Sequence, residues 1–122
     1  MTFGEAVKSG FEHYAKFDGR ASRPAYWWWV LFAVLVGIAA NIIDFALISP
    51  GVIGGLVGLA LLLPNLSVSI RRLHDTGRTG WWILIALVPL IGFIVLLIFY
   101  LQPSDAVPNQ YGPPMDSVAP AV

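Results

Sequence analysis

The sequence predicts an all-α membrane protein with three transmembrane helices and an N-terminal amphipathic interfacial helix. Of its 122 residues, 57% are hydrophobic and only 11% are charged, whereas a soluble domain is roughly half apolar and about a quarter charged. Three apolar runs are each long enough to cross a bilayer, and every arginine lies outside them. We therefore expect residues 1–101 to form a single membrane domain and residues 102–122 to form an extended or disordered tail.

The first expected element is a short helix over residues 2–17. Thr2 and Glu5 match a capping box, which satisfies free amide groups at a helix start. Aromatic and apolar residues then recur at helical spacing on one side, and Lys8, Glu12 and Lys16 occupy the other side. This pattern is typical of a helix in the membrane interface. An ordinary amphipathic helix that packs on other protein explains it equally well.

The first transmembrane helix is expected over residues 26–48. Ser22 is an N-cap residue, and Pro24 lies near the first helical position, where its missing N–H costs nothing. The apolar run would reach roughly 34 Å, enough for a hydrocarbon core about 30 Å thick. Trp27 and Trp28 at its start are expected to be interfacial anchors.

Two more transmembrane helices are expected, over residues 52–70 and 81–101. The Ser49-Pro50-Gly51 break makes the first two spans a tight hairpin, and glycines four residues apart favour close helix contact. The third run has no charge and would span roughly 31 Å. We expect bends within this helix at Pro89, which lacks an amide donor, and at Gly92.

Orientation follows from the distribution of basic residues. All of them lie before the first apolar run or between the second and third: Lys8, Lys16, Arg20, Arg23, Arg71, Arg72 and Arg78. Because basic loops stay on the cytoplasmic side, we expect a multi-pass protein with a cytoplasmic N-terminus and a C-terminus outside.

Three stretches resemble a known family. GRASRPAYWWWVLF, LPNLSVSIRRLHDTGRTGWW and PNQYGP together are similar to the DUF805 family of small bacterial inner-membrane proteins. The resemblance covers nearly the whole chain and departs from the family pattern at Thr79, where serine is common, and after Gly112, where an asparagine is missing. It implies a bacterial inner-membrane location and three helices, and it implies no particular activity.

The polar stretch from Arg71 to Trp82 has a structural interpretation. Basic residues in the last turn of a helix favour the negative end of its dipole, and Gly77 can end the helix in a left-handed conformation. Trp81 and Trp82 would then be interfacial anchors. Helix termination and anchoring therefore explain most of this stretch.

A more specific interpretation is an anion site. Two arginine-rich segments at the same membrane face could bind phosphate oxygens of an anionic phospholipid headgroup, or a partner protein. Aspartates could instead neutralise these arginines as internal ion pairs. The candidate binding residues are Arg20, Arg23, Arg71, Arg72, His74, Asp75 and Arg78.

Enzymatic chemistry has little support in the sequence. His74 and Asp75 are adjacent, and adjacent helical residues point about 100° apart, so they do not form an orienting dyad. The chain has two histidines and no cysteine, which disfavours a metal site. Seven basic residues balance seven acidic ones, which does not suggest nucleic-acid binding. We therefore expect no catalysis, no cofactor and no metal.

Polar residues inside the apolar runs should face other helices, because they are costly in lipid. These residues are Asn41, Asp44, Asn65 and Ser69. They could join helices by hydrogen bonds, or line an ion path in an oligomeric channel or transporter component. Our main interpretation is a membrane-organising or interaction module, either as a homo-oligomer or with a membrane protein partner; the channel component is the alternative.

Overall fold

The computed structural model describes residues 2–48, 50–105 and 107–113, and these residues contain helices but no β-strand beyond an isolated bridge between Asn109 and Gly112. The elements follow in the order α1 (Phe3–Glu12), α2 (Arg23–Ala46), α3 (Val52–Asp75), the 3-10 helix η1 (Gly80–Leu87) and α4 (Ile91–Leu101). For the described residues, the prediction of an all-helical protein is confirmed.

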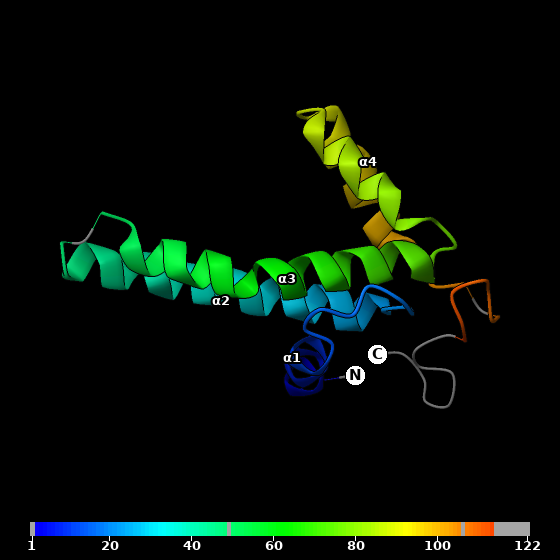
Figure 1. Cartoon of the computed structure of the whole chain (residues 1–122), viewed down its shortest axis with the longest axis horizontal. Coiled ribbons are helices and arrows are strands. Elements are labelled where there is room, and N and C mark those ends of the chain that lie inside the picture. Colours follow the sequence, from blue (N-terminus) through cyan, green and yellow to red (C-terminus); the bar gives the residue numbers. More distant parts are fainter. Residues whose placement is uncertain (1, 49, 106, 114–122) are drawn as a thin grey trace.

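Helices α2 and α3 lie side by side and antiparallel along the long axis of the molecule (Figure 1). The predicted cap starts α2, because the Ser22 hydroxyl accepts a hydrogen bond from the Ala25 amide at 3.3 Å. Each helix has 24 residues and is therefore roughly 36 Å long. Only 17% and 22% of their most apolar stretches are buried. By length and composition, both helices could cross a membrane.

Helix α1 is shorter than the predicted 2–17 segment and packs on α2. Both hydrogen bonds of the predicted capping box are present, and the bond from the Thr2 amide lowers the pKa of Glu5. The ring of Phe3 meets Trp28 edge-on at 5.8 Å, and Phe11 meets Trp29 at 5.2 Å. The aromatic side of α1 thus packs on α2. That α1 lies in a membrane interface stays a prediction.

Residues 81–101 do not form the single continuous helix that we predicted. The chain runs through η1, reverses at Val88-Pro89-Leu90 and returns as α4 beside η1 (Figure 1). At Gly92 a Cβ atom would lie 1.8 Å from the Ile85 carbonyl oxygen, so the close approach requires glycine. Each limb is roughly 16 Å long, about half of a hydrocarbon core. The prediction of one continuous helix over residues 81–101 is therefore wrong, and the structure gives no third helix of full membrane length among the described residues.

This reversal brings the tail back to the arginine-rich end of the molecule. The Asp105 amide donates to the Asp75 carbonyl oxygen at 2.9 Å, and Arg20 donates to the Val107 carbonyl at 3.1 Å. The described tail residues therefore lie beside the N-terminal segment, and the orientation of the termini in a membrane stays a prediction. The rest of the predicted tail, residues 114–122, lies outside the described residues.

Candidate functional site

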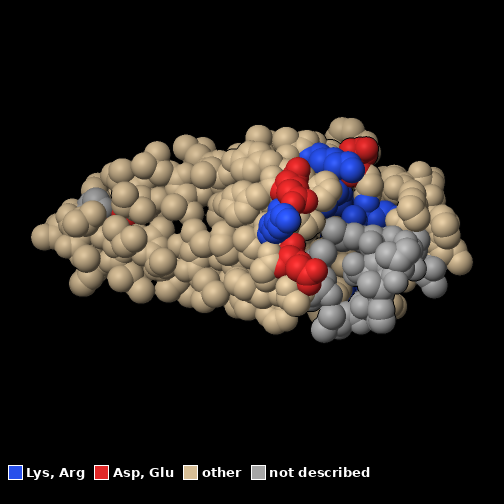
Figure 2. Space-filling model, turned by 90° about the horizontal axis from the view of Figure 1, so that it is seen from below, with Lys and Arg blue, Asp and Glu red and all other residues tan. Residues whose placement is uncertain are grey.

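Most charged side chains gather toward one end of the molecule, where α2 begins and α3 and α4 end. Figure 2 shows this concentration of charge, and most of the remaining visible face is uncharged. Of the seven predicted binding residues, Arg23 is exposed and Arg78 is half-buried. The other five are buried: Arg20, Arg71, Arg72, His74 and Asp75.

Asp75 is the centre of this end. Helix α3 continues five residues past the predicted transmembrane span and ends at Asp75, so its last turn holds basic residues, as the interpretation of this stretch as a helix end predicts. Its Oδ1 accepts from Arg20 Nε at 2.9 Å, and its Oδ2 accepts from Arg72 Nη1 at 2.7 Å. The hydroxyl of Ser104 also donates to Oδ2. We call these four residues the Asp75 cluster. The three charged side chains are at most 1% exposed.

Arg20 fastens the tail to the end of α3. Its Nη1 donates to the carbonyl oxygens of Val107 and Gly112, both at 3.1 Å. Its Nη2 donates to the Asp105 carbonyl at 2.7 Å and to the Asp75 carbonyl at 3.1 Å. Carbonyl acceptors can satisfy a buried guanidinium without a second acid. The Arg20 guanidinium is therefore occupied within the protein.

Arg72 fastens the end of α4 to the end of α3 in the same way. Its Nε and Nη2 donate to the Tyr100 carbonyl at 3.2 and 3.1 Å, and Nη2 also donates to the Gln102 carbonyl. Trp27 Nε1 donates to the Tyr100 carbonyl at 3.1 Å as well. The last carbonyls of a helix lack partners within the helix and carry partial negative charge, so donors and cations cap them.

His74 is used in packing rather than in an acid–base pair. Its Nδ1 lies 2.9 Å from the Gly19 carbonyl oxygen, which assigns the proton to Nδ1 because a carbonyl only accepts. Its ring stacks on Tyr111 with a centroid distance of 3.9 Å, and Asn109 donates to its carbonyl at 3.0 Å. The neighbouring Asp75 carboxylate faces the two arginines instead. No catalytic dyad is formed.

Arg71 lies beneath the turn between α1 and α2. Its Nε donates to the Ser67 hydroxyl at 3.3 Å, and that hydroxyl donates in turn to the carbonyls of His13, at 2.8 Å, and Lys16. Its Nη2 is buried without a hydrogen-bond partner among the described residues. The negative charge of Asp18 lies close enough to stabilise the charged form of the Arg71 guanidinium. Arg71 thus joins α3 to the N-terminal turn.

Arg23 and Arg78 are the two arginines outside this buried set. Arg78 lies over the Phe99 ring at 4.0 Å, as in a cation–π contact, and Trp82 meets the same ring edge-on at 5.3 Å. Arg23 donates from Nη1 to the Leu101 carbonyl at 3.3 Å. Trp81 is 78% exposed. Arg23, Arg78 and Trp82 therefore lie around the end of α4.

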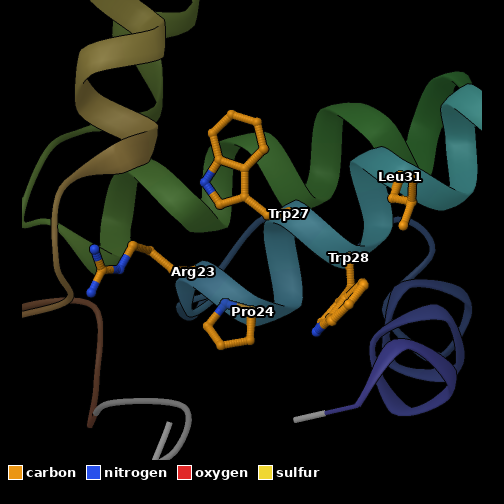
Figure 3. Close-up of a pocket in the computed structure, with 5 residues that line it drawn as sticks. All are labelled: Arg23, Pro24, Trp27, Trp28 and Leu31. Carbon is orange, nitrogen blue, oxygen red and sulfur yellow. The ribbon is translucent and has the colours of Figure 1, made fainter. Parts of the chain in front are cut away.

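A groove of about 360 Å³ lies at the start of α2 (Figure 3). Arg23 stands at one end and Leu31 at the other, with the two predicted tryptophan anchors between them. Trp27 points toward α4, and Trp28 points toward α1 (Figure 3). This groove combines one cation with an apolar wall, which suits an amphipathic ligand.

The predicted intramembrane polar residues join helices. Asp44 caps α3, because its carboxylate oxygens accept from the amides of Ile53 and Gly54, both at 2.8 Å. Asn65 Oδ1 accepts from Trp29 Nε1 at 2.7 Å. Two further residues complete the set: Ser69 is a hydrogen-bond partner of Tyr26 and Tyr100, and Asn41 faces Gly54. These contacts favour the joining of helices over an ion path.

Sequence reasoning missed several residues of this site. Ser67 and Ser104 were not singled out, although both hold charged side chains in place. Asn109 and Tyr111 belong to the PNQYGP stretch, whose resemblance to a family pattern was the available signal. Within the part of the chain that the structure describes, no group of three or more histidine or acidic side chains could hold a metal ion.

Comparison with known proteins places the chain among inner membrane proteins of one family. The family described as "Protein of unknown function (DUF805)" matches residues 14–113. "Inner membrane protein YhaI" of Escherichia coli (strain K12) is 41% identical over 105 residues, which cover 85% of this chain and 89% of the relative. "Inner membrane protein YhaH" of the same strain is 33% identical over 107 residues, covering 84% and 88%. No solved structure matches the chain.

Proposed function

The chain belongs to the DUF805 family, and from this premise we propose that it is a non-catalytic interaction module of the inner membrane whose arginine-rich end binds anionic phospholipid headgroups. The observation that carries this proposal is the position of Arg23. Its exposed guanidinium stands beside Trp27 and Trp28 at the end of a long apolar helix. This is the depth at which headgroup phosphates lie beside an aromatic belt.

In this proposal α2 and α3 cross the bilayer, and the hairpin of η1 and α4 enters one leaflet only. Large apolar side chains are exposed along both long helices and along the hairpin, for example Ile42, Leu59 and Phe93 at 63%, 71% and 66%. Extended apolar surface of this kind is unusual on a water-soluble monomer. Lipid is the covering that the names of the relatives support.

The sidedness follows from the basic residues and from the contacts of Arg20. Every lysine and arginine lies before α2, at its first residue, in the last turns of α3 or between α3 and η1, and all these places are at the same end of the molecule. The positive-inside rule therefore favours a cytoplasmic location for that end. Arg20 holds the described tail residues at this end. We therefore propose that the N-terminal segment and the tail up to residue 113 are both cytoplasmic.

The charges at this end favour an anion. Five arginines lie near three aspartates among the described residues: Arg20, Arg23, Arg71, Arg72 and Arg78 with Asp18, Asp75 and Asp105. Asp75 is shared by Arg20 and Arg72, and Arg23 lies close enough to Arg72 for their charges to interact. A guanidinium has five donors and forms forked hydrogen bonds with phosphate oxygens. Arg23 and Arg78 are the accessible arginines of this set.

The experiment compares an anionic with a zwitterionic lipid. The full chain is purified in a mild detergent, and binding of phosphatidylglycerol and phosphatidylcholine is measured by native mass spectrometry. We expect the protein to prefer phosphatidylglycerol, whose phosphate charge is not offset by a choline cation. We expect Arg23→Gln with Arg78→Gln to lower that preference by roughly tenfold, because the two positive charges that attract the net negative headgroup are lost.

Two control variants make this result specific. Arg23→Lys loses the forked hydrogen bonds but keeps the positive charge, so it should keep most of the preference for the lipid with net negative charge. Lys8→Gln removes a charge on α1 whose side chain is 76% exposed and pairs with Glu12 at 3.7 Å, so it should have no effect. Equal binding of the two lipids by the wild-type protein would overturn the proposal.

A further inference from the structure

A second groove lies on the other side of Trp27 from the groove of Figure 3. It has a volume of about 500 Å³ and lies between α2 and the hairpin of η1 and α4. Val30 of α2 and Phe93 and Leu97 of α4 are among the residues that line it, and the turn at Pro89 lines it as well. Both grooves fall within the range of about 300–1,000 Å³ that is typical of ligand sites.

Trp27 is a fixed partition between the two grooves. Its ring lines both of them, and its Nε1 is held by the Tyr100 carbonyl at 3.1 Å. Arg23 lies one helical turn before Trp27, and Val30 and Leu31 lie one turn after it. Residues three and four apart share a helix face. This face of α2 therefore carries one cation followed by apolar side chains, and Trp27 among them separates the two grooves.

We propose that the two grooves form a single site for a two-chain anionic phospholipid, with its phosphate on Arg23 and one acyl chain on each side of Trp27. This inference rests on the proposed function and specifies its ligand. Arg23 lies at the charged end of the molecule, where the headgroup would be. The first groove runs from there along α2 (Figure 3), and the second passes from Trp27 along the hairpin of η1 and α4.

The depth of the second groove favours a lipid chain over a helix of another protein. Its far wall is the hairpin, whose limbs are each roughly 16 Å long. One leaflet of a core about 30 Å thick has nearly this depth. A transmembrane helix of a partner would be about twice as long as this wall. The hairpin wall is thus too short for a transmembrane helix of a partner and suits a single acyl chain.

The experiment changes the number of chains and fills each groove separately. Native mass spectrometry of the full chain measures binding of palmitoyl-oleoyl phosphatidylglycerol, which has two chains, and of palmitoyl lysophosphatidylglycerol, which has one. We expect the two-chain lipid to bind roughly tenfold more tightly to the wild-type protein. We expect Leu97→Trp, which fills the second groove, and Leu31→Trp, which fills the first, to remove this difference.

Matched control variants add the same side chain outside the grooves. Ile98→Trp on α4 and Leu35→Trp on α2 replace residues that are 52% and 50% exposed and line neither groove. Both should bind the two-chain lipid like the wild-type protein. Thermal unfolding in detergent shows whether each variant is folded, and Val30→Phe fills the second groove from α2 if Leu97→Trp is not.

The outcomes separate this inference from the proposed function. If folded groove variants bind both lipids like the wild-type protein while the arginine variants lose the preference for phosphatidylglycerol, only the two-chain site is overturned. If the wild-type protein does not distinguish phosphatidylglycerol from phosphatidylcholine, the proposed function is overturned. Equal binding of the one-chain and two-chain lipids by the wild-type protein overturns the inference directly.

Discussion

The carboxylate of Asp75 lies between the guanidinium groups of Arg20 and Arg72, at 2.9 and 2.7 Å. This contact joins the turn before α2, the end of α3 and, through carbonyl acceptors of the two arginines, the tail and the end of α4. Segments that are up to 92 residues apart thus meet around one buried acid. The arginines of the predicted anion site are in large part structural.

Asp75→Asn should strongly destabilise the fold. It leaves two buried guanidinium groups without their shared carboxylate, and breaking a buried ion pair from one side costs about 3–5 kcal/mol. The measurement is thermal unfolding in detergent, followed by circular dichroism. Glu12→Gln is the control, because it removes an acid whose pair with Lys8 has side chains that are 55% and 76% exposed, and such pairs contribute about 0–1 kcal/mol. Equal melting of both variants would refute the structural role.

Gly92→Ala should force apart the hairpin of η1 and α4. The added Cβ would lie 1.8 Å from the Ile85 carbonyl oxygen, which belongs to the backbone and cannot rotate away. Overpacking of this kind typically costs about 1–3 kcal/mol. Gly55→Ala is the matched control, because no atom lies within 4 Å of its added Cβ. Unfolding of the two variants at the same temperature would contradict the close contact between η1 and α4.

Cysteine labelling can test the reversal of the chain directly, because the chain contains no cysteine. We expect Lys16→Cys and Gln110→Cys to react with a membrane-impermeant thiol reagent from the same side of the inner membrane. Pro50→Cys, in the turn between α2 and α3, should react from the opposite side. Labelling of Gln110→Cys together with Pro50→Cys would restore a third span and contradict the hairpin.

Asp44→Ala should weaken the start of α3. The carboxylate caps the amides of Ile53 and Gly54, and loss of such a cap costs about 0.5–2 kcal/mol. Asp44→Asn keeps a capping oxygen and should cost less. Thermal unfolding measures both changes. A proton or ion flux in vesicles that disappears in Asp44→Asn, at unchanged stability, would instead support the channel alternative.

Much of the helical organisation could be predicted from the sequence. Ser22, Pro24 and the apolar run place α2 within a few residues of its expected bounds, since caps and proline act locally. Apolar length also identifies both candidate spans. The predicted transmembrane span ends at residue 70, but the interpretation of the following stretch as a helix end is confirmed: basic residues occupy the last turn of α3, and Gly77 follows it with a positive φ.

The sequence by itself determined a membrane-type helical chain, its arginine-rich segments and its family resemblance, because composition, caps and apolar length are properties of neighbouring residues. Only the tertiary structure decided that residues 80–101 fold back on themselves. An apolar run of this length suits one full helix or two short limbs equally, and the contact of Gly92 with Ile85 selects the second. That reversal returns the tail to Arg20, and so decides which arginines are occupied internally and which stay accessible.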